Sequence, residues 1–214
     1  MSTGTPHGQL FVVAAPSGAG KTSLVRAVVE RCADAEVTVS HTTRTRRPGE
    51  VDGVNYFFVD HDRFCAMRDQ GEFVEWATVF GNYYGTSHAE IDRVTASGRH
   101  VILEIDWQGA QQIRQARPGA RSIFILPPSM QTLHERLLQR AQDDHKTIAR
   151  RMDEAISEMS HYAEFDYVIV NDDFETALDE IDRIIHGEIG QTELSPGRDA
   201  LKPLIADLLP ARPV

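Results

Sequence analysis

An apolar run that leads through a glycine-rich loop into an amphipathic stretch constrains this chain more than any other feature. Residues 10–31 read LFVVAAPSGAGKTSLVRAVVER. Residues 10–14 have the length and composition of a buried strand, and the residues after Lys21 place apolar side chains on one side of a helix. The loop between them is rich in Gly, Ser and Pro, which are turn-forming residues. A strand that passes through a tight loop directly into a helix is typical of α/β proteins with a parallel sheet.

The loop has the composition of a phosphate-binding loop of the pattern G-x-x-x-x-G-K-[ST]. Its backbone N–H groups would surround a polyphosphate, the Lys21 amine would reach the outer phosphates, and the Thr22 hydroxyl would hold Mg²⁺. Ala15 stands where the pattern has Gly, and an Ala there requires a negative φ. A glycine-rich turn that binds no nucleotide is the alternative, but the flanking elements and the Lys-Thr pair favour nucleotide binding. We therefore predict ATP contacts from Ala15, Pro16, Ser17, Gly18, Ala19, Gly20, Lys21 and Thr22.

Charge and composition argue against several other classes of protein. The formal net charge is −10, from 22 Lys and Arg against 32 Asp and Glu, which argues against broad binding to nucleic acid or to anionic membranes. The first eight residues are polar and no apolar run reaches the length of a membrane span, so we expect a cytoplasmic protein. The nine histidines show no H-x-x-x-H spacing, and Cys32 and Cys65 are far apart, so we expect buried free thiols and no zinc site.

Strand-like and helix-like segments alternate along the rest of the chain, which predicts a parallel sheet covered by helices on both faces. We expect further strands at residues 36–40, 56–59, 72–80, 101–105, 122–126 and 167–170. We expect further helices at residues 61–70, 88–96, 108–116, 129–140, 143–163 and 174–186, the first two capped by Asp60 and Ser87. Along residues 72–80, alternation places Phe73, Glu75, Ala77 and Val79 on one face.

Residues 41–87 have their own strands and aromatic content, and we interpret them as an inserted α+β region. Three arginines, Arg44, Arg46 and Arg47, occur within four positions. Guanidinium groups bind phosphate bidentately, so this cluster predicts a second phosphate site. The alternative is a solvated loop with no ligand.

Glu75 is an acidic residue in an apolar strand, where a carboxylate requires partners. Tyr56, Tyr84 and Thr86 offer hydroxyl donors in the same region. A buried carboxylate suits a base with adjacent N–H donors, and guanine has such donors at N1 and N2. The alternative is that Glu75 forms a structural ion pair with one of the nearby arginines.

The chain resembles the bacterial guanylate kinases in five segments that occur in the same order: APSGAGKT, VSHTTRTRRPGEVDGVNY, EFVEWATVFGNYYGTS, VILEIDWQGA and DYVIVNDDF. The resemblance covers residues 8–187 and implies the Mg²⁺-dependent reaction ATP + GMP → ADP + GDP, with GMP or dGMP as acceptor, in purine metabolism and GMP recycling. It also implies a core (8–40, 88–128 and 164–187), a GMP-binding insertion (41–87), a lid (129–163) and a peripheral tail (188–214).

The resemblance assigns roles to individual residues. It places the GMP phosphate on Arg44, Arg47, Tyr56 and Tyr84, and it places guanine on Ser40, Glu75 and Thr86 with Glu104 close by. Asp106 matches the acidic position near Mg²⁺, which Thr22 would also bind, and Lys21, Arg44 and Asp106 would act in catalysis. Arg46 falls where the family often has another residue, so we expect it to be dispensable.

The lid region departs from the family pattern. Family lids often read R-G-R-G followed by acidic residues, whereas residues 138–143 read LQRAQD and keep one arginine and neither glycine. Arg140 and Arg151 are expected to close over ATP and to act in catalysis, whereas Arg136 and Arg150 are expected to be exposed helix charges. The missing glycines affect how easily the lid closes rather than the chemistry.

Two other functions are compatible with parts of the sequence. A P-loop kinase for another small molecule, such as a phosphorylated sugar, would need Lys21 and Thr22 but not the set Glu75, Tyr84 and Thr86. A non-catalytic guanylate-kinase-like module that binds phosphopeptides would not need the intact loop ending in Gly20, Lys21 and Thr22. We expect ATP and GMP as partners, with no nucleic acid and no membrane, and a homo-oligomer is compatible with the sequence.

Overall fold

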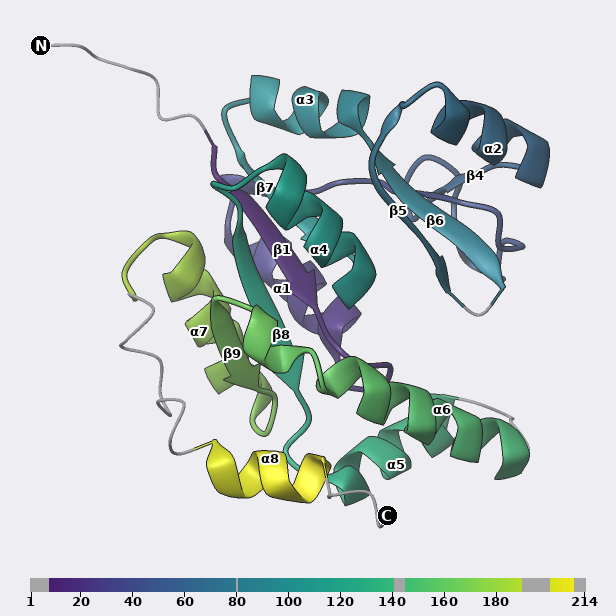
Figure 1. Cartoon of the computed structure of the whole chain (residues 1–214). Coiled ribbons are helices and arrows are strands. Elements are labelled where there is room, and N and C mark those ends of the chain that lie inside the picture. The colour runs from purple at the N-terminus through teal and green to yellow at the C-terminus, as the bar shows by residue number, and fades with distance from the viewer. Residues whose placement is uncertain (1–7, 80, 141–144, 190–200, 210–214) are drawn as a thin grey trace, which may run out of the picture. The chain divides into compact units, whose positions relative to one another are not determined.

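The computed structural model describes residues 8–79, 81–140, 145–189 and 201–209 (Figure 1). It divides into two compact units. The first unit consists of Met1–Val12 and Ala33–Arg121, and the second consists of Val13–Cys32 and Ser122–Val214. Strand β1 (Leu10–Ala14) contributes residues to both units.

The first unit contains parallel strands from the larger of the two sheets. Here the strand order is β2-β7-β1, with β2 at Ala35–Val37 and β7 at His100–Glu104. Strands β2 and β7 are parallel, with Ala35 opposite His100. Helix α3 (His88–Ala96) precedes β7 and helix α4 (Trp107–Ala116) follows it.

A second sheet in the same unit has the order β4-β3-β6-β5. Its strands are β3 (His41–Thr42), β4 (Phe57–Phe58), β5 (Phe73–Val79) and β6 (Asn82–Ser87). Strands β5 and β6 are antiparallel, and β3 pairs antiparallel with β6 and parallel with β4. Helix α2 (His61–Asp69) lies beside the β5–β6 pair and contributes the buried Phe64 and Met67 (Figure 1).

The second unit contains the parallel strands β8 (Arg121–Leu126) and β9 (Tyr167–Val170). The first residue of β8, Arg121, belongs to the first unit. Its helices are α1 (Lys21–Arg31), α5 (Met130–Arg140), α6 (His145–Met159), α7 (Phe174–Ile185) and α8 (Lys202–Leu208), with a 3₁₀ turn at Tyr162–Glu164. Helix α7 buries an apolar stripe that includes Leu178 and Ile181 and contacts α1 and β9. Parallel strands with covering helices confirm the predicted α/β fold class.

Both predicted helix caps are confirmed. The Asp60 carboxylate accepts a hydrogen bond from the Arg63 N–H, and the Ser87 hydroxyl accepts one from the Glu90 N–H. Each satisfies one of the N–H groups that the first turn of a helix leaves without a backbone partner. No described helix is both long and apolar enough to cross a membrane.

The predicted strand at 36–40 and the predicted helix at 143–163 end earlier than expected. Beyond Val37 the Thr38 N–H still donates to the Ile102 carbonyl, but the Val39 N–H donates to the carboxylate of Glu90 instead of a strand. Helix α6 ends at Met159 because the chain tightens there, with the His161 N–H donating to the Glu158 carbonyl three residues back. Residues 143 and 144 of the predicted helix lie outside the described part of the chain.

The prediction that Phe73 lies on the same face of β5 as Glu75 is wrong. The pairing of β5 with β6 shifts register between Phe73 and Glu75, as a β-bulge does. Phe73 therefore packs in the cluster of Phe64 and Met67 with Trp76, rather than on the side of Glu75. The short strand β3 was also not predicted, since its two polar residues carry no strand pattern of their own.

Candidate active site

Two glycines give the loop after β1 its shape. Gly18 and Gly20 have φ values of 92° and 95°, in the left-handed region that favours glycine. A Cβ on Gly20 would lie 2.4 Å from Nδ2 of Asn171, and one on Gly18 would lie 2.9 Å from a methyl group of Leu133. Gly20 is the N-cap of α1 and makes no side-chain capping hydrogen bond. The start of α1 therefore has the form of an anion-binding helix end, with Lys21 and Thr22 in its first turn.

Side chains distant in sequence hold this loop in place. The Asn171 side chain, which is 4% exposed, donates to the Ala19 carbonyl at 2.7 Å. Arg136 in turn donates to the Asn171 carbonyl at 3.1 Å, and Glu158 on α6 accepts a hydrogen bond from the Ser17 N–H at 3.0 Å. Arg136 was expected to be an exposed charge, and this expectation is wrong because its guanidinium reaches the chain just beyond β9.

The register of β5 and β6 gathers the predicted base-reading residues in the first unit. Glu75 is paired with Thr86, and Ala77 with Tyr84, so Glu75, Tyr84 and Thr86 share one face of the pair. The Ser40 and Thr86 hydroxyl oxygens lie 3.0 Å apart, within hydrogen-bonding distance. Glu75 is 3% exposed, although it carries a carboxylate.

Glu75 also lies against the first turn of α4. A Cβ on Gly109 would be 2.5 Å from Oε2 of Glu75, so only a glycine leaves room for the carboxylate there. The partial positive charge at a helix N-terminus favours a carboxylate in that position. The predicted residues Ser40, Glu75 and Thr86 thus combine an acid with two hydroxyl groups.

Arg44 lies in an aromatic and acidic environment. Its guanidinium carbon lies 5.4 Å from the centre of the Tyr56 ring, and the Tyr56 ring lies 5.9 Å from that of Tyr84. Two guanidinium nitrogens donate to the Glu50 carboxylate, at 2.7 and 3.1 Å, and the Arg47 N–H donates to it at 2.7 Å. The hydrogen bond from Arg44 lowers the pKa of Glu50, and the same bond raises the pKa of Arg44.

Tyr56 keeps its proton at neutral pH. Burial, together with the negative charge of Glu104, raises the pKa of the Tyr56 phenol to about 12. A protonated phenol beside a guanidinium can donate a hydrogen bond to a phosphate oxygen. The structure thus brings together Arg44, Tyr56, Tyr84 and Glu104, while Arg46 and Arg47 are exposed.

Asp106 is the N-cap of α4 and lies two residues after β7 ends at Glu104. One carboxylate oxygen accepts from the Gly109 N–H at 2.8 Å and the other from the Gln108 side chain at 3.2 Å. These bonds fix the orientation of the carboxylate, and each oxygen retains capacity to accept a second contact.

Comparison with known proteins decides the family. The family model for guanylate kinase matches residues 7–188. The chain belongs to the guanylate kinase family. Guanylate kinase of Alkalilimnicola ehrlichii is 54% identical over 202 residues, which cover 94% of this chain and 97% of that protein. Guanylate kinase of Escherichia coli K12 is 58% identical over 184 residues, covering 85% of this chain and 89% of that protein.

A solved guanylate kinase also has this fold. The crystal structure of guanylate kinase from Anaplasma phagocytophilum matches with a TM-score of 0.70 at 33% identity, covering 94% of this chain and 95% of that one. The resemblance to guanylate kinases that the five motifs indicated is therefore confirmed.

The predicted lid residues of this guanylate kinase family member are only partly described. Arg140 is the last residue of α5, and its side chain lies outside the described part of the structure. Arg151 is partly buried on α6. Arg150 is an exposed helix charge as expected, with its side chain 64% exposed and Glu154 at 3.9 Å.

Three contacts around the site were not expected from the sequence. Glu50 directly follows the Pro-Gly pair and lies six residues after Arg44. Opposite charges on the two sides of a turn are a sequence signal that could have predicted their ion pair. Asn171 and Glu158 had no such signal, because their partners in the loop are 152 and 141 residues away.

One group of described side chains could hold a metal ion, and it contains none of the predicted Mg²⁺ ligands. Cys32, Asp182 and His186 place one ligand atom each within 4.8 Å of one another. The Cys32 thiol donates to Asp182, and His186 lies one helical turn beyond Asp182 near the end of α7. Neither cysteine forms a disulfide, and of the two thiols predicted to be buried only Cys32 is fully buried.

Proposed function

We propose that this chain transfers the γ-phosphoryl group of ATP to GMP or dGMP, giving ADP and GDP or dGDP. The observation that carries the proposal is its membership of the guanylate kinase family, with 54% and 58% identity to two guanylate kinases over most of its length. Residues 41–87 would then be the GMP-binding region and residues 129–163 the lid, with residues 188–214 peripheral.

ATP would bind through the loop before α1. The backbone of residues 15–20 and the start of α1 would surround the phosphates, and Lys21 would reach the γ-phosphate. The hydrogen bonds of Asn171 and Glu158 to this loop support that role, because a loop held in shape before binding loses less entropy when ATP binds. Arg140 and Arg151 would complete the site from the lid.

GMP would bind at the second sheet. The Glu75 carboxylate would accept hydrogen bonds from guanine N1–H and N2–H₂, and the Ser40 and Thr86 hydroxyls would contact the base, with Glu104 nearby. Arg44, Arg47, Tyr56 and Tyr84 would bind the phosphate. Arg44 has five N–H donors, so it can retain Glu50 and still contact a phosphate.

Thr22 and Asp106 would hold Mg²⁺, partly through water. A hydroxyl and a carboxylate are the oxygen ligands that Mg²⁺ prefers, so this donor set fits the ion. When bound, Mg²⁺ would neutralise charge on the β- and γ-phosphates.

The protein groups need only align and stabilise the reacting phosphates. The GMP phosphate is already ionised, so a phosphate oxygen attacks the γ-phosphorus without a nucleophilic side chain or a general base. Lys21 and Arg44 stabilise the charge that develops in the transition state. Closure of the lid excludes water, which would otherwise hydrolyse ATP.

The test is to measure ADP release from ATP and Mg²⁺ with GMP, dGMP, IMP, AMP and a phosphorylated sugar as acceptors. We expect ADP release that is fastest with a guanine nucleotide, stops with EDTA and resumes with excess Mg²⁺. ADP release with the phosphorylated sugar but not with GMP would assign another P-loop kinase. Phosphopeptide binding without any phosphoryl transfer would assign a binding module.

A further inference from the structure

A second buried carboxylate, Glu90, lies outside the residues assigned above. Glu90 is in the first turn of α3 and is 5% exposed, so its charge is removed from water. Burying a carboxylate is costly unless hydrogen bonds compensate for the lost hydration. The contacts of Glu90 therefore indicate what the position requires.

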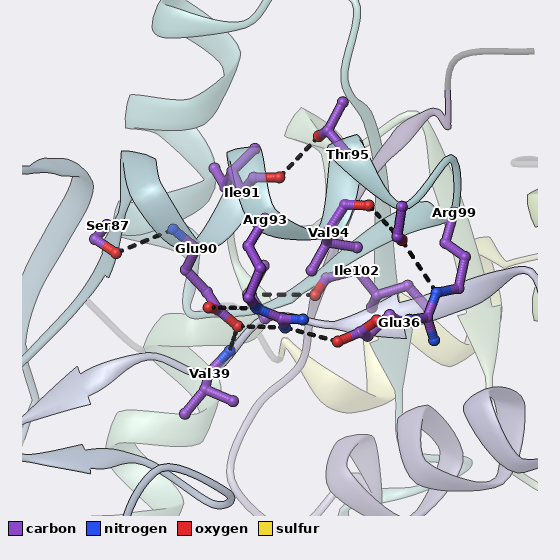
Figure 2. A network of polar contacts seen from close by, with 12 residues as sticks. Glu36, Val39, Ser87, Glu90, Ile91, Arg93, Val94, Thr95, Arg99 and Ile102 are labelled. Carbon is purple, nitrogen blue, oxygen red and sulfur yellow. Dashed lines mark hydrogen bonds and ion pairs between the residues drawn. The ribbon is translucent and has the colours of Figure 1, made fainter. Parts of the chain in front are cut away.

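Glu90 accepts hydrogen bonds from its own helix and from the segment between β2 and β3 (Figure 2). Its Oε1 accepts from the Val39 N–H at 2.9 Å, beyond the end of β2. Arg93, three residues along the same helix, donates to Oε2 at 2.9 Å and to Oε1 at 2.8 Å. Arg93 also donates to Glu36 on β2 at 2.6 Å.

The network keeps Glu90 charged. Burial alone would raise the pKa of Glu90, but the hydrogen bonds from Arg93 and from the Val39 N–H outweigh it and lower the pKa. The hydrogen bonds that Arg93 donates to Glu90 and Glu36 raise the pKa of Arg93. Glu90 is therefore an anion at neutral pH, and its bond to the Val39 N–H is charge-assisted.

The Val39 N–H lies one residue before Ser40, and α3 begins at His88, two residues after Thr86. Val39 lies two residues beyond the end of β2 at Val37, and Ser40 is the residue before β3. Ser87 is the N-cap of α3, with its hydroxyl accepting from the Glu90 N–H at 3.3 Å. Glu90 thus links the segment that carries Ser40 to the helix that begins beside Thr86, and the Ser40 and Thr86 hydroxyls meet at 3.0 Å.

We propose that Glu90 is a positioning residue for GMP: its carboxylate, oriented by Arg93, holds Val39 so that the Ser40 hydroxyl stays against Thr86 in the base-binding site. The inference rests on the proposed function for the identity of the ligand. Without the carboxylate, the Val39 N–H loses its acceptor, and the hydroxyl of Ser40 is no longer fixed for the base.

The test compares Glu90→Ala, Glu90→Gln and Arg93→Ala with the wild type. We expect Glu90→Ala to raise KM for GMP about tenfold or more, because a hydrogen bond to a charged group is lost, while KM for ATP changes less than about twofold. Glu90→Gln should recover part of the loss, since its amide oxygen can still accept from Val39 N–H. Arg93→Ala should have a smaller effect than Glu90→Ala.

Arg99→Ala is the matched control. Arg99 pairs with the other oxygen of Glu36, at 2.7 Å, and belongs to the same network without bonding to Glu90. Its removal should leave KM for GMP unchanged. Amide hydrogen exchange adds a direct measurement. The Val39 N–H should exchange faster in Glu90→Ala than in the wild type, and its exchange rate should be unchanged in Arg99→Ala.

Three results would overturn the proposal. The first is an unchanged KM for GMP in a folded Glu90→Ala, and the second is an unchanged exchange rate of the Val39 amide in that variant. The third is an equal rise in KM for ATP and for GMP together with a lower Tm, which would indicate a purely structural acid. If Glu90→Ala fails to fold, Glu90→Gln and Arg93→Ala decide by the same criteria. A wild type without GMP-dependent ADP release would overturn the proposed function instead, and the exchange measurement would still report whether Glu90 holds Val39.

Discussion

Replacing Gly109 with Ala tests whether the position of the Glu75 carboxylate determines recognition of the base. Gly109 is a buried residue in the first turn of α4, and its φ is not in the left-handed region. Ala is favoured over Gly in a helix by about 1 kcal/mol, so the backbone itself would accept the change. The new Cβ, however, would lie 2.5 Å from Oε2 of Glu75.

The magnitude follows from that distance. Ordinary contacts of a Cβ begin at 3.4 Å, so the carboxylate must move by the difference from 2.5 Å, about 0.9 Å. A displacement of about 1 Å in a positioned group costs on the order of a hundredfold in rate, or about 2.7 kcal/mol. We therefore expect Gly109→Ala to lower kcat/KM for GMP about a hundredfold, with KM for ATP unchanged.

Steady-state ADP release with varied GMP, and then with varied ATP, measures both effects, and thermal unfolding shows that the variant is folded. Gly119→Ala is the control, since a Cβ there would meet nothing within 4 Å and its φ is not in the left-handed region. A folded Gly109→Ala with the GMP kinetics of the wild type would show that the base is not read through Glu75 in this position.

Three further changes test the remaining assignments. The wild type should prefer GMP over AMP roughly a thousandfold in kcat/KM, with IMP between them. Glu75→Gln should weaken the binding of GMP and narrow the preference for GMP over AMP, because the new amide can donate as well as accept. An unchanged ranking of the three nucleotides and an unchanged affinity for GMP in the variant would make Glu75 a structural acid. Lys21→Ala should lower kcat about a thousandfold in a folded protein, with Lys202→Ala as control, and near-normal turnover would contradict the assignment of the phosphate loop. Arg44→Ala should lose about 2–5 kcal/mol of GMP binding by titration calorimetry while the exposed Arg46→Ala stays mild, and the reverse order would mean that the phosphate is bound in another register.

The elements that carry the nucleotide loop could be predicted from the sequence because their signals are local. Strand β1 occupies residues 10–14 as expected, and α1 begins at Lys21 directly after the glycine loop. Asp60 and Ser87 were recognised as caps because a cap acts on N–H groups within three residues of itself. Each of these features depends on side chains and backbone that are close together in the chain.

The supports of the site could not be predicted in the same way, because they depend on contacts between distant segments. Asn171 looks like an ordinary residue after a strand until β9 brings it to the Ala19 carbonyl, 152 residues away. The face of Phe73 was mistaken for a related reason, since a bulge is defined by the partner strand and strict alternation cannot reveal it.

Glu75 and Glu90 show how far a sequence pattern can separate two buried acids. Glu75 stands in an apolar strand, so its burial and its need for partners were visible in the sequence. Glu90 is followed by Arg93 three residues later on a helix, which is the spacing of an exposed ion pair, yet Glu90 is 5% exposed and Arg93 has half of its side chain in solvent. Only the fold supplies the reason, because the Val39 N–H has left the sheet and takes its acceptor from α3. The Glu90 carboxylate accepts from the backbone of Val39, so we propose that it positions the chain, whereas the Glu75 carboxylate lies beside Gly109 at the start of α4, where we propose that the base binds.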